Sequence, residues 1–306
     1  MTIRHIRIFL AVCENGNNLT RAAKALYMAQ PAVSLAISEL EEHYGTRLFE
    51  RLSRRLYLTE AGLRMREYAS HVVSLFDEME QSLGGWDVSG VLHVGASITI
   101  GSQLMPGYVS AFRELRPEMD VRVTIGTSEQ LERRLLYNQM DFALLERSIH
   151  SPSLVGERYM EDSLTVLCGA GAPFREGQVL TPEEFAAQRF LLREPGSGTR
   201  ELFDSAMEAA GITVTPAWEA MSTTALINAA IQRLGLAVVS RRLAEGYLAR
   251  GQVKTLRLAG VDFRRSFRVV YHKDKFLTPA ARDFIQLCRE AGKAAGPQPS
   301  PGPAAP

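Results

Sequence analysis

Residues 19–62 have the pattern of two short helices that cross closely. The first carries the small residues Ala22 and Ala23, and a three-residue turn over 27–29 follows it. The second, over 31–44, places apolar side chains at steps of four and three on one face. Small residues permit a close crossing, and the short turn forces a steep angle. The pattern therefore predicts a helix-turn-helix, whose second helix enters the major groove of DNA.

Positive charge follows the second helix. The segment Arg47–Leu56 is rich in arginine and is predicted to form a hairpin, or wing. The net charge of +1 for the whole chain argues against a protein that coats nucleic acid, but it permits a localised basic module. Residues 1–58 carry eight Lys/Arg and five Asp/Glu. With a first helix over 2–15, they are predicted to form a winged helix-turn-helix domain.

The remaining composition is that of a soluble globular protein. With 306 residues, 46% of them hydrophobic, the chain has room for a small domain and a larger one. Its three cysteines, Cys13, Cys168 and Cys288, lack the spacing of metal ligands, so reduced thiols are expected. Neither a signal peptide nor a run of apolar residues long enough for a membrane span is recognisable, and a cytoplasmic location is expected.

A long helix is predicted from Thr59, as N-cap, to about residue 83. Its apolar residues repeat at heptad spacing: Met65, Tyr68, Val72, Leu75, Met79 and Leu83. Such a seam on an exposed helix predicts a partner helix, and the alternative is packing against its own domain. Two glycines, at 84–85, then break the helix. Residues 59–87 are therefore predicted to be a dimerising linker and a hinge.

From residue 88 to 291, short apolar strands alternate with helical patterns. Strands are expected over 91–96, 121–125, 142–145, 164–168, 190–192, 217–220, 236–239 and 267–271, and helices over 103–116, 128–138, 199–210, 223–234, 241–249 and 279–291. This alternation predicts parallel sheets in two lobes with a cleft between them. Lobe I is expected over 91–163 and 268–291, and lobe II over 164–267. The Ala/Gly/Pro-rich end, 292–306, is predicted to be a disordered tail.

The segments LTRAAKAL, AQPAVSLAISELEEHYGTRLFER and LTEAG resemble the N-terminal signature of LysR-type bacterial transcriptional regulators. The resemblance extends to about Ala291. It implies a winged helix-turn-helix, a dimerising linker helix and an α/β two-lobed effector domain similar to periplasmic binding proteins. It also implies a homodimer or homotetramer bound to promoter DNA, a small-molecule effector, RNA polymerase as a candidate partner, and no cofactor. Three segments, at 95–106, 193–201 and 271–281, resemble the sulphite-responsive branch that regulates sulphur assimilation.

The recognition helix is expected to read bases with neutral groups. Its outward positions near the start are Gln30, Pro31, Ser34 and Leu35; the first three match family positions that contact DNA. Gln30 is suited to adenine and Leu35 to a thymine methyl. The chain departs from the family at Ala29, which lacks an N-cap hydroxyl, and in having no Lys or Arg over 30–44. Phosphate contacts are therefore expected from five other residues: Thr20, Arg21, Arg51, Arg54 and Arg55. The alternatives are a capping role for Gln30 and Ser34 and a solvated face for the arginines.

Ligands of parallel α/β lobes lie at the carboxyl ends of strands, where helices begin. Three such junctions carry hydroxyls and predict a site for a small anion. The candidate residues are Ser97, Thr99, Ile100 and Gly101 at the first, Thr127 and Ser128 at the second, Glu194, Ser197, Gly198 and Thr199 at the third, and Thr223 at a weaker fourth. The alternative at each is a plain N-cap. Glu146 ends another strand, and it suits an anion site only if it is protonated or pairs with Arg147 or His150. The alternative is a structural salt bridge.

Two other classes of protein compete with a regulator. An enzyme using Gly196–Thr199 to hold a cofactor phosphate is the first, but the six histidines lack metal-ligand pairing and no P-loop or dinucleotide fingerprint is present. A solute-binding receptor for a small anion is the second, and the lobes alone would suit it. The attached helix-turn-helix favours the regulator, with neither catalytic residues nor a metal.

Overall fold

The computed structural model describes residues 1–52, 55–83 and 90–295. It divides into two compact units, the first made mainly of residues 1–90 and the second mainly of the residues from Val91 on. Arg54, the predicted hinge glycines at 84–85 and the tail from 296 on lie outside the described residues. Within the described ranges, no helix is long and apolar enough to cross a lipid bilayer.

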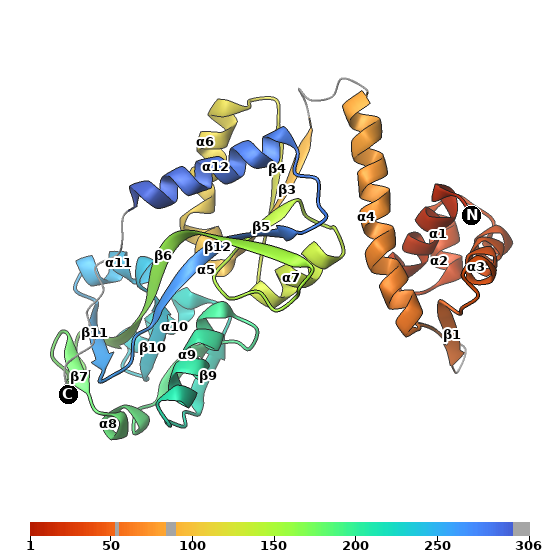
Figure 1. Ribbon diagram of the computed structural model, residues 1–306. Coiled ribbons are helices and arrows are strands. Elements are labelled where there is room, and N and C mark those ends of the chain that lie inside the picture. The colour runs from red at the N-terminus through yellow and green to blue at the C-terminus, as the bar shows by residue number, and fades with distance from the viewer. Residues whose placement is uncertain (53–54, 84–89, 296–306) are drawn as a thin grey trace. The chain divides into compact units, whose positions relative to one another are not determined.

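The first unit contains three short helices and a two-stranded wing (Figure 1). Its elements are α1 (Ile3–Glu14), α2 (Leu19–Ala25), α3 (Gln30–Tyr44), and the antiparallel strands β1 (Phe49–Leu52) and β2 (Arg55–Leu58). Ala22 and Val33 are fully buried in the shared core, so α2 and α3 lie in close contact. Gly45 ends α3 in the left-handed conformation, with φ +63°. The predicted winged helix-turn-helix is confirmed.

Helix α4 (Glu60–Leu83) follows the wing. Thr59 caps it as predicted, because its Oγ1 accepts a hydrogen bond of 3.0 Å from the backbone N–H of Gly62. Only part of the heptad seam packs on its own domain: Met65 contacts the core of the first unit. The rest is exposed, by 70% at Tyr68 and 45% at Leu75. The Leu83 side chain lies outside the described residues.

Lobe I of the second unit is a sheet with helices packed on it. Its elements are β3 (Val91–Ser97), α5 (Ile98–Gln103), α6 (Met105–Leu115), β4 (Asp120–Gly126), α7 (Ser128–Leu136), β5 (Phe142–Leu145) and α12 (Pro279–Ala294). The strands β4, β3 and β5 are adjacent and parallel, so their carboxyl ends share one edge. Phe112, Phe142 and Phe284 are fully buried and bring α6, β5 and α12 into one core.

Lobe II has cores on both faces of its sheet. Its elements are β7 (Gln178–Leu180), α8 (Pro182–Ala186), β8 (Phe190–Arg193), α9 (Gly198–Ala209), β9 (Pro216–Ala220), α10 (Thr223–Ile231), β10 (Leu236–Ser240), α11 (Arg241–Ala249) and β11 (Val253–Leu258). Strand β8 is parallel to both β9 and β10, so these three also end at one edge. The two-lobed α/β fold is confirmed.

The prediction that the sheets are parallel is wrong for two long strands, β6 (Leu154–Gly169) and β12 (Arg264–His272). They pair antiparallel to each other, and they lie side by side between the lobes in Figure 1. β6 also pairs antiparallel with β10 and β11, and β12 with β5, so the full order is mixed. The pattern predicted only residues 164–168 of β6, because its first half is rich in charged residues. Of these residues, Asp162 lies opposite Arg265 and Glu161 lies opposite Ser266 of β12.

Candidate DNA-binding and effector sites

The start of α3 offers the side chains that the sequence predicted. Gln30, Pro31 and Leu35 are exposed, Leu35 by 60%, and Ser34 is half-buried. The opposite face holds Val33, which is fully buried. Ala29 stands at the N-cap with no side-chain hydrogen bond, as its lack of a hydroxyl dictates. The helix therefore presents an amide, a hydroxyl and a methyl-rich group, which suit direct contacts to bases in the major groove.

The cationic groups predicted for phosphate contact lie outside α3. Arg21 is exposed at the start of α2, whose N-cap Asn18 accepts hydrogen bonds of 3.0 Å from the backbone N–H groups of Thr20 and Arg21. Arg51 and Arg55 are exposed on the two strands of the wing. Among the described residues, none of these three arginines forms an ion pair, so their charge is available to phosphates.

One positioning residue was missed in the sequence. Glu41, on α3, accepts hydrogen bonds from the backbone N–H of Leu48, at 2.8 Å, and of Phe49, at 3.1 Å. It also pairs with Arg47 at 3.0 Å. These contacts fix the first strand of the wing to the recognition helix. A glutamate on a helix surface carries no pattern that reveals such a partner.

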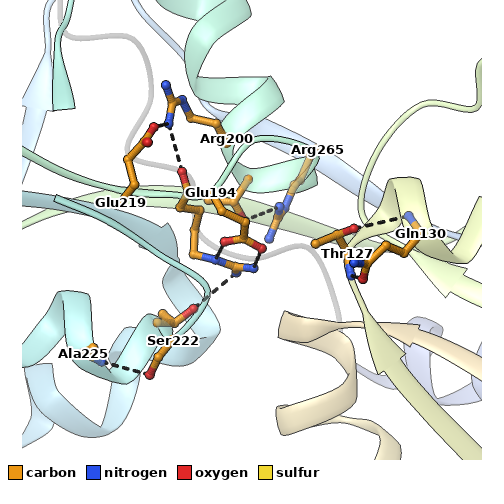
Figure 2. Close-up of polar contacts among 11 residues, drawn as sticks. Thr127, Gln130, Glu194, Arg200, Glu219, Ser222, Ala225 and Arg265 are labelled. Carbon is orange, nitrogen blue, oxygen red and sulfur yellow. Dashed lines mark hydrogen bonds and ion pairs between the residues drawn. The ribbon is translucent and has the colours of Figure 1, made fainter.

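A second group of polar residues gathers where the strands of both lobes end. Ser97 ends β3, Thr127 and Ser128 join β4 to α7, and Ser197 precedes α9. In the β3–β4 register Ser97 lies opposite Gly126, so the first two junctions are neighbours. We call the polar groups at these junctions the interlobe site. Figure 2 shows Thr127 and Gln130 of lobe I and Glu194, Arg200 and Glu219 of lobe II in this region.

Four buried hydroxyls of this site have no hydrogen-bond partner among the described residues: those of Ser97, Thr99, Ser128 and Ser197. Each residue is at most 3% exposed. A buried polar atom without a partner costs about 1–3 kcal/mol. Ordered water or a bound ligand supplies the partners of such atoms in folded proteins, and all four hydroxyls donate well to an oxyanion.

The lobes are in contact around this site. A Cβ added to Gly196 would lie 2.7 Å from Glu129 Oε2, and one added to Gly198 would lie 2.8 Å from Glu146 Cγ. Gly196 also has φ +81°, a conformation that favours glycine. Both glycines belong to lobe II and both glutamates to lobe I. Ser197 therefore lies directly against the strand ends of lobe I.

Two arginines missed in the sequence supply positive charge. Arg193, only 2% exposed, pairs with both carboxylate oxygens of Glu194 at 2.7 and 2.8 Å, and its Nη1 donates to Thr223 Oγ1 at 3.4 Å. Arg265 donates from Nη1 to Thr199 Oγ1 at 3.1 Å (Figure 2). The predicted residues Glu194, Thr199 and Thr223 are thus the partners of these guanidinium groups, and Glu194 neutralises the charge of Arg193.

Glu146 has a different partner from those proposed for it. Its carboxylate lies 2.9 Å from Arg265 Nη2, whereas Arg147 pairs with Glu132 at 3.1 Å and with Glu201 at 3.0 Å. Arg265 Nε also donates to Asp162 Oδ2 at 2.7 Å. Burial disfavours the charged guanidinium, but the two carboxylates outweigh it and raise the pKa of Arg265 above its usual value. A buried structural salt bridge, one of the predicted alternatives, is therefore what the structure contains.

Two predicted residues offer no side chain to the site. Ile100 is fully buried in the core of lobe I, and Gly101 packs against the side chain of Ile125. Both lie in α5, a helix that the sequence pattern did not predict, so their contribution is limited to backbone groups. The described residues include no group of His, Cys, Asp and Glu that could hold a metal ion.

The comparisons with known proteins agree with this architecture. Residues 3–63 match the family described as bacterial regulatory helix-turn-helix protein, lysR family, and residues 87–293 match the LysR substrate binding domain. The second match alone covers more than half of the chain. The chain belongs to the LysR family of transcriptional regulators.

Its LysR relatives align over nearly their whole length. An uncharacterized HTH-type regulator, YeiE of Escherichia coli strain K12, is 30% identical over 291 residues, 95% of this chain and 98% of YeiE. The RuBisCO operon transcriptional regulator of Allochromatium vinosum is 30% identical over 290 residues, 94% of this chain and 95% of that protein. Among solved structures, a full-length OxyR variant from Pseudomonas aeruginosa has the same fold, with a TM-score of 0.71, 18% identity, and coverage of 96% of this chain and 98% of OxyR.

Membership of the LysR family decides between the classes of protein that the sequence left open. The family and the relatives are transcriptional regulators with a DNA-binding domain and a small-molecule effector domain. The chain is accordingly a regulator and not an enzyme. The Gly196–Thr199 loop belongs to an effector domain rather than to a cofactor site.

Proposed function

We propose that this LysR-type regulator binds promoter DNA through α3 and the wing, and that a small anion bound at the interlobe site controls it. The observation that carries the effector part is the set of four buried hydroxyls without partners among the described residues, beside the buried arginines Arg193 and Arg265. Hydroxyl groups and helix N-termini bind oxyanions well, and the two arginines neutralise the carboxylates of Glu194 and Glu146 that lie nearby.

For the effector we favour sulphite or another small sulphur anion. The segments at 95–106, 193–201 and 271–281 resemble the sulphur-assimilation branch, and a pocket of hydroxyls suits a compact oxyanion. A relative of equal identity is named as a regulator of a RuBisCO operon, which makes a phosphorylated or carboxylated metabolite the competing class.

Thermal unfolding of the full-length protein, with sulphite, sulphate, thiosulphate, acetylserine and a small phosphorylated sugar acid each titrated in turn, separates these classes. Sulphite is expected to raise Tm the most, and a Ser97→Ala/Ser128→Ala variant is expected to lose that shift. A larger shift with the phosphorylated compound would replace the sulphur assignment, and no shift with any compound would overturn both.

The DNA part is tested by a gel-shift assay with the DNA upstream of the gene for this chain and with the neighbouring promoter region. A retarded complex that a competitor of the same sequence removes, and that a scrambled competitor does not, is expected. Failure to shift these fragments at every salt and effector concentration would overturn promoter binding, whatever the result of the effector titrations.

The proposed mechanism is a shift of population between open and closed lobes. Gly196 against Glu129 and Gly198 against Glu146 support a closed arrangement in which the hydroxyls of both lobes face one ligand. A ligand that binds this arrangement more tightly than an open one favours closure. Closure then changes how subunits pack and how far the operator is bent.

We further propose that the chain assembles as a homodimer or homotetramer. The exposed seam of α4, from Tyr68 to Met79, is apolar at heptad spacing and complements a second copy of itself. In the effector domain, β4 is an edge strand with exposed Val123 and Ile125, and together with α6 it borders an apolar groove of about 580 Å³. Both surfaces suit contact between copies of this chain.

A further inference from the structure

A second pocket lies beside the interlobe site. It has a volume of about 460 Å³. Arg147 and Ser148 of lobe I, Ser205 of lobe II, and Arg158 and Arg268 of the two crossing strands are among its lining residues. The hydroxyls of Ser97, Thr99 and Ser128, which have no hydrogen-bond partner among the described residues, do not line it. The pocket therefore offers a different set of groups from the interlobe site.

Two arginines of this pocket are partners in the ladder, and neither has a carboxylate partner among the described residues. Arg158 on β6 pairs with Arg268 on β12 immediately after the register irregularity between Phe267 and Arg268, and both line the pocket. Directly paired residues of antiparallel strands project from the same face of the sheet, and like charges in such a pair are destabilising. Arg268 Nη1 reaches the backbone oxygen of Gly156 at 3.4 Å. The side chain of Arg158 has no hydrogen bond or ion pair with any residue in the described ranges.

The acidic groups of the pocket are already engaged. Three glutamates line it: Glu146 pairs with Arg265, Glu201 with Arg147, and Glu161 accepts a hydrogen bond from Ser266. Five arginines line the same pocket, and one of them, Arg264, pairs with Asp262 outside the lining. The other four exceed the three glutamates by one positive charge. Arg158 and Arg268 are the two lining arginines without a carboxylate partner among the described residues.

We infer that this pocket is a second anion site, for a small molecule with two acidic groups that binds between Arg158 and Arg268. Guanidinium groups bind carboxylates and phosphates in bidentate fashion, so a dicarboxylate or a diphosphate fits the same pair. The bound anion attracts both guanidinium groups, which otherwise repel each other across the two strands.

The pocket is built to communicate with the interlobe site. Glu146, Arg265 and Gly198 line it and also belong to the interlobe site. Arg147 and Glu201, which pair at 3.0 Å, join lobe I to α9 of lobe II at its wall. An anion that reaches Ser205 of lobe II as well as the two arginines of the crossing strands favours the closed arrangement. This coupling, unlike the binding itself, rests on the proposed effector function, and it is reciprocal between the two ligands.

The test is isothermal titration calorimetry of the full-length protein with two probes, malonate and inorganic pyrophosphate, in low-chloride buffer. At least one probe is expected to bind, and R158Q and R268Q are each expected to weaken binding at least tenfold. The matched control is R122Q, which alters an exposed arginine on β4 outside the pocket. The Ser97→Ala/Ser128→Ala variant is expected to retain the binding, because its hydroxyls belong to the other site.

Thermal unfolding of the same proteins checks that the variants fold. R158Q alone is expected to raise Tm of the anion-free protein by about 1–2 °C, because it removes a like-charge pair. The probe that binds is expected to raise Tm of the wild type and of R122Q, but not of R158Q. Absence of binding by both probes, or binding unchanged in both R158Q and R268Q, would overturn the inference. Binding lost only in the hydroxyl variant would assign the anion to the interlobe site instead.

Discussion

Arg265 and Glu146 form a buried ion pair, with Nη2 and Oε2 2.9 Å apart, although they are 119 residues apart in the sequence. Their side chains are 5% and 2% exposed. Arg265 is also held by Asp162 and Thr199, so one guanidinium connects the crossing strands to the strand ends of lobe I and to the start of α9. This connection explains why a carboxylate is tolerated beside the proposed anion site.

Glu146→Gln is expected to lower the free energy of unfolding by about 2 kcal/mol. Removing one partner of a buried pair leaves a charge without compensation, and Asp162 retains part of that compensation here. Urea unfolding of the full-length protein measures the change. Glu118→Gln, at an exposed position between α6 and β4 of lobe I, is the control and is expected to change little. Equal effects of the two substitutions would contradict a structural role for the Glu146 pair.

Replacing Arg51 and Arg55 together by alanine is expected to flatten the salt dependence of DNA binding. Each phosphate contact contributes about 0.9 to the slope of log K against log salt, so the slope falls by about 1.8 for each wing that contacts the DNA. Gel shifts or fluorescence anisotropy at several salt concentrations give this slope. The Arg122→Ala protein, altered in the effector domain, is expected to keep the wild-type slope. An unchanged slope in the wing variant would mean that the phosphates are contacted elsewhere.

Gln30→Ala is expected to relax sequence preference rather than salt dependence. A bidentate contact from an amide to adenine discriminates against other bases by about 1–3 kcal/mol. Binding to a set of operators, each with one base pair changed, is the appropriate measurement. The substitution should reduce the loss of affinity caused by changing one base pair in each half of the operator. The losses caused by changing the other base pairs should stay the same. A uniform loss of affinity at all positions would point instead to a capping role for Gln30.

Leu75→Glu, in the exposed seam of α4, is expected to halve the mass of the assembly. A charge in an apolar seam that pairs with its copy would be buried without a partner. Light scattering coupled to size-exclusion chromatography measures the mass. Arg64→Glu, on the same helix and 74% exposed in its side chain, is the control and should leave the mass unchanged. If both variants keep the wild-type mass, the seam is not the interface.

The three cysteines are expected to react slowly with thiol reagents. Burial raises the pKa of the Cys13 thiol to about 12, and it also raises the pKa of Cys168 and Cys288. Because the pKa is raised, the thiolate fraction stays small until the pH approaches the pKa. At pH 8 about one Cys13 in 10⁴ is ionised, against about one in four for a free cysteine.

The rate of reaction with iodoacetamide, followed at pH 7, 8 and 9 in the native and the guanidinium-unfolded protein, tests this expectation. The native rate is expected to be at least about 100-fold lower over this range. Rapid labelling of one cysteine in the native protein would identify an accessible thiolate and contradict the effect of burial.

Much of the architecture follows from patterns that are local in the chain. The stripe of Val33, Ile37 and Leu40 predicts α3 because a helix places these residues on one face, and all three are buried. The hydroxyls at strand ends are likewise local, since each follows a short apolar strand. The same patterns predicted the two lobes and the strand ends that form the interlobe site.

The features that were missed depend on partners far away in sequence. The first half of β6 reads as polar because Glu161 and Asp162 interrupt it, yet Ser266 and Arg265 compensate them across the ladder. Arg193 and Arg265 are buried cations, and a burial pattern predicts apolar residues at such positions. Glu41 acts on backbone groups of the wing. No periodicity in the chain encodes a contact that forms only after distant segments meet.

The place of α12 in the core of lobe I has a consequence for synthesis. Phe284, Ile285 and Cys288 pack with Leu92 and Val94, so the two ends of the effector domain complete one core. The cores of lobe II use only residues from 164 to 263. A nascent chain that ends before Pro279 therefore contains all of the lobe II cores but an unfinished lobe I. The ribosome must release the last helix before the effector domain closes, and truncated products expose the apolar face of β3 to proteases.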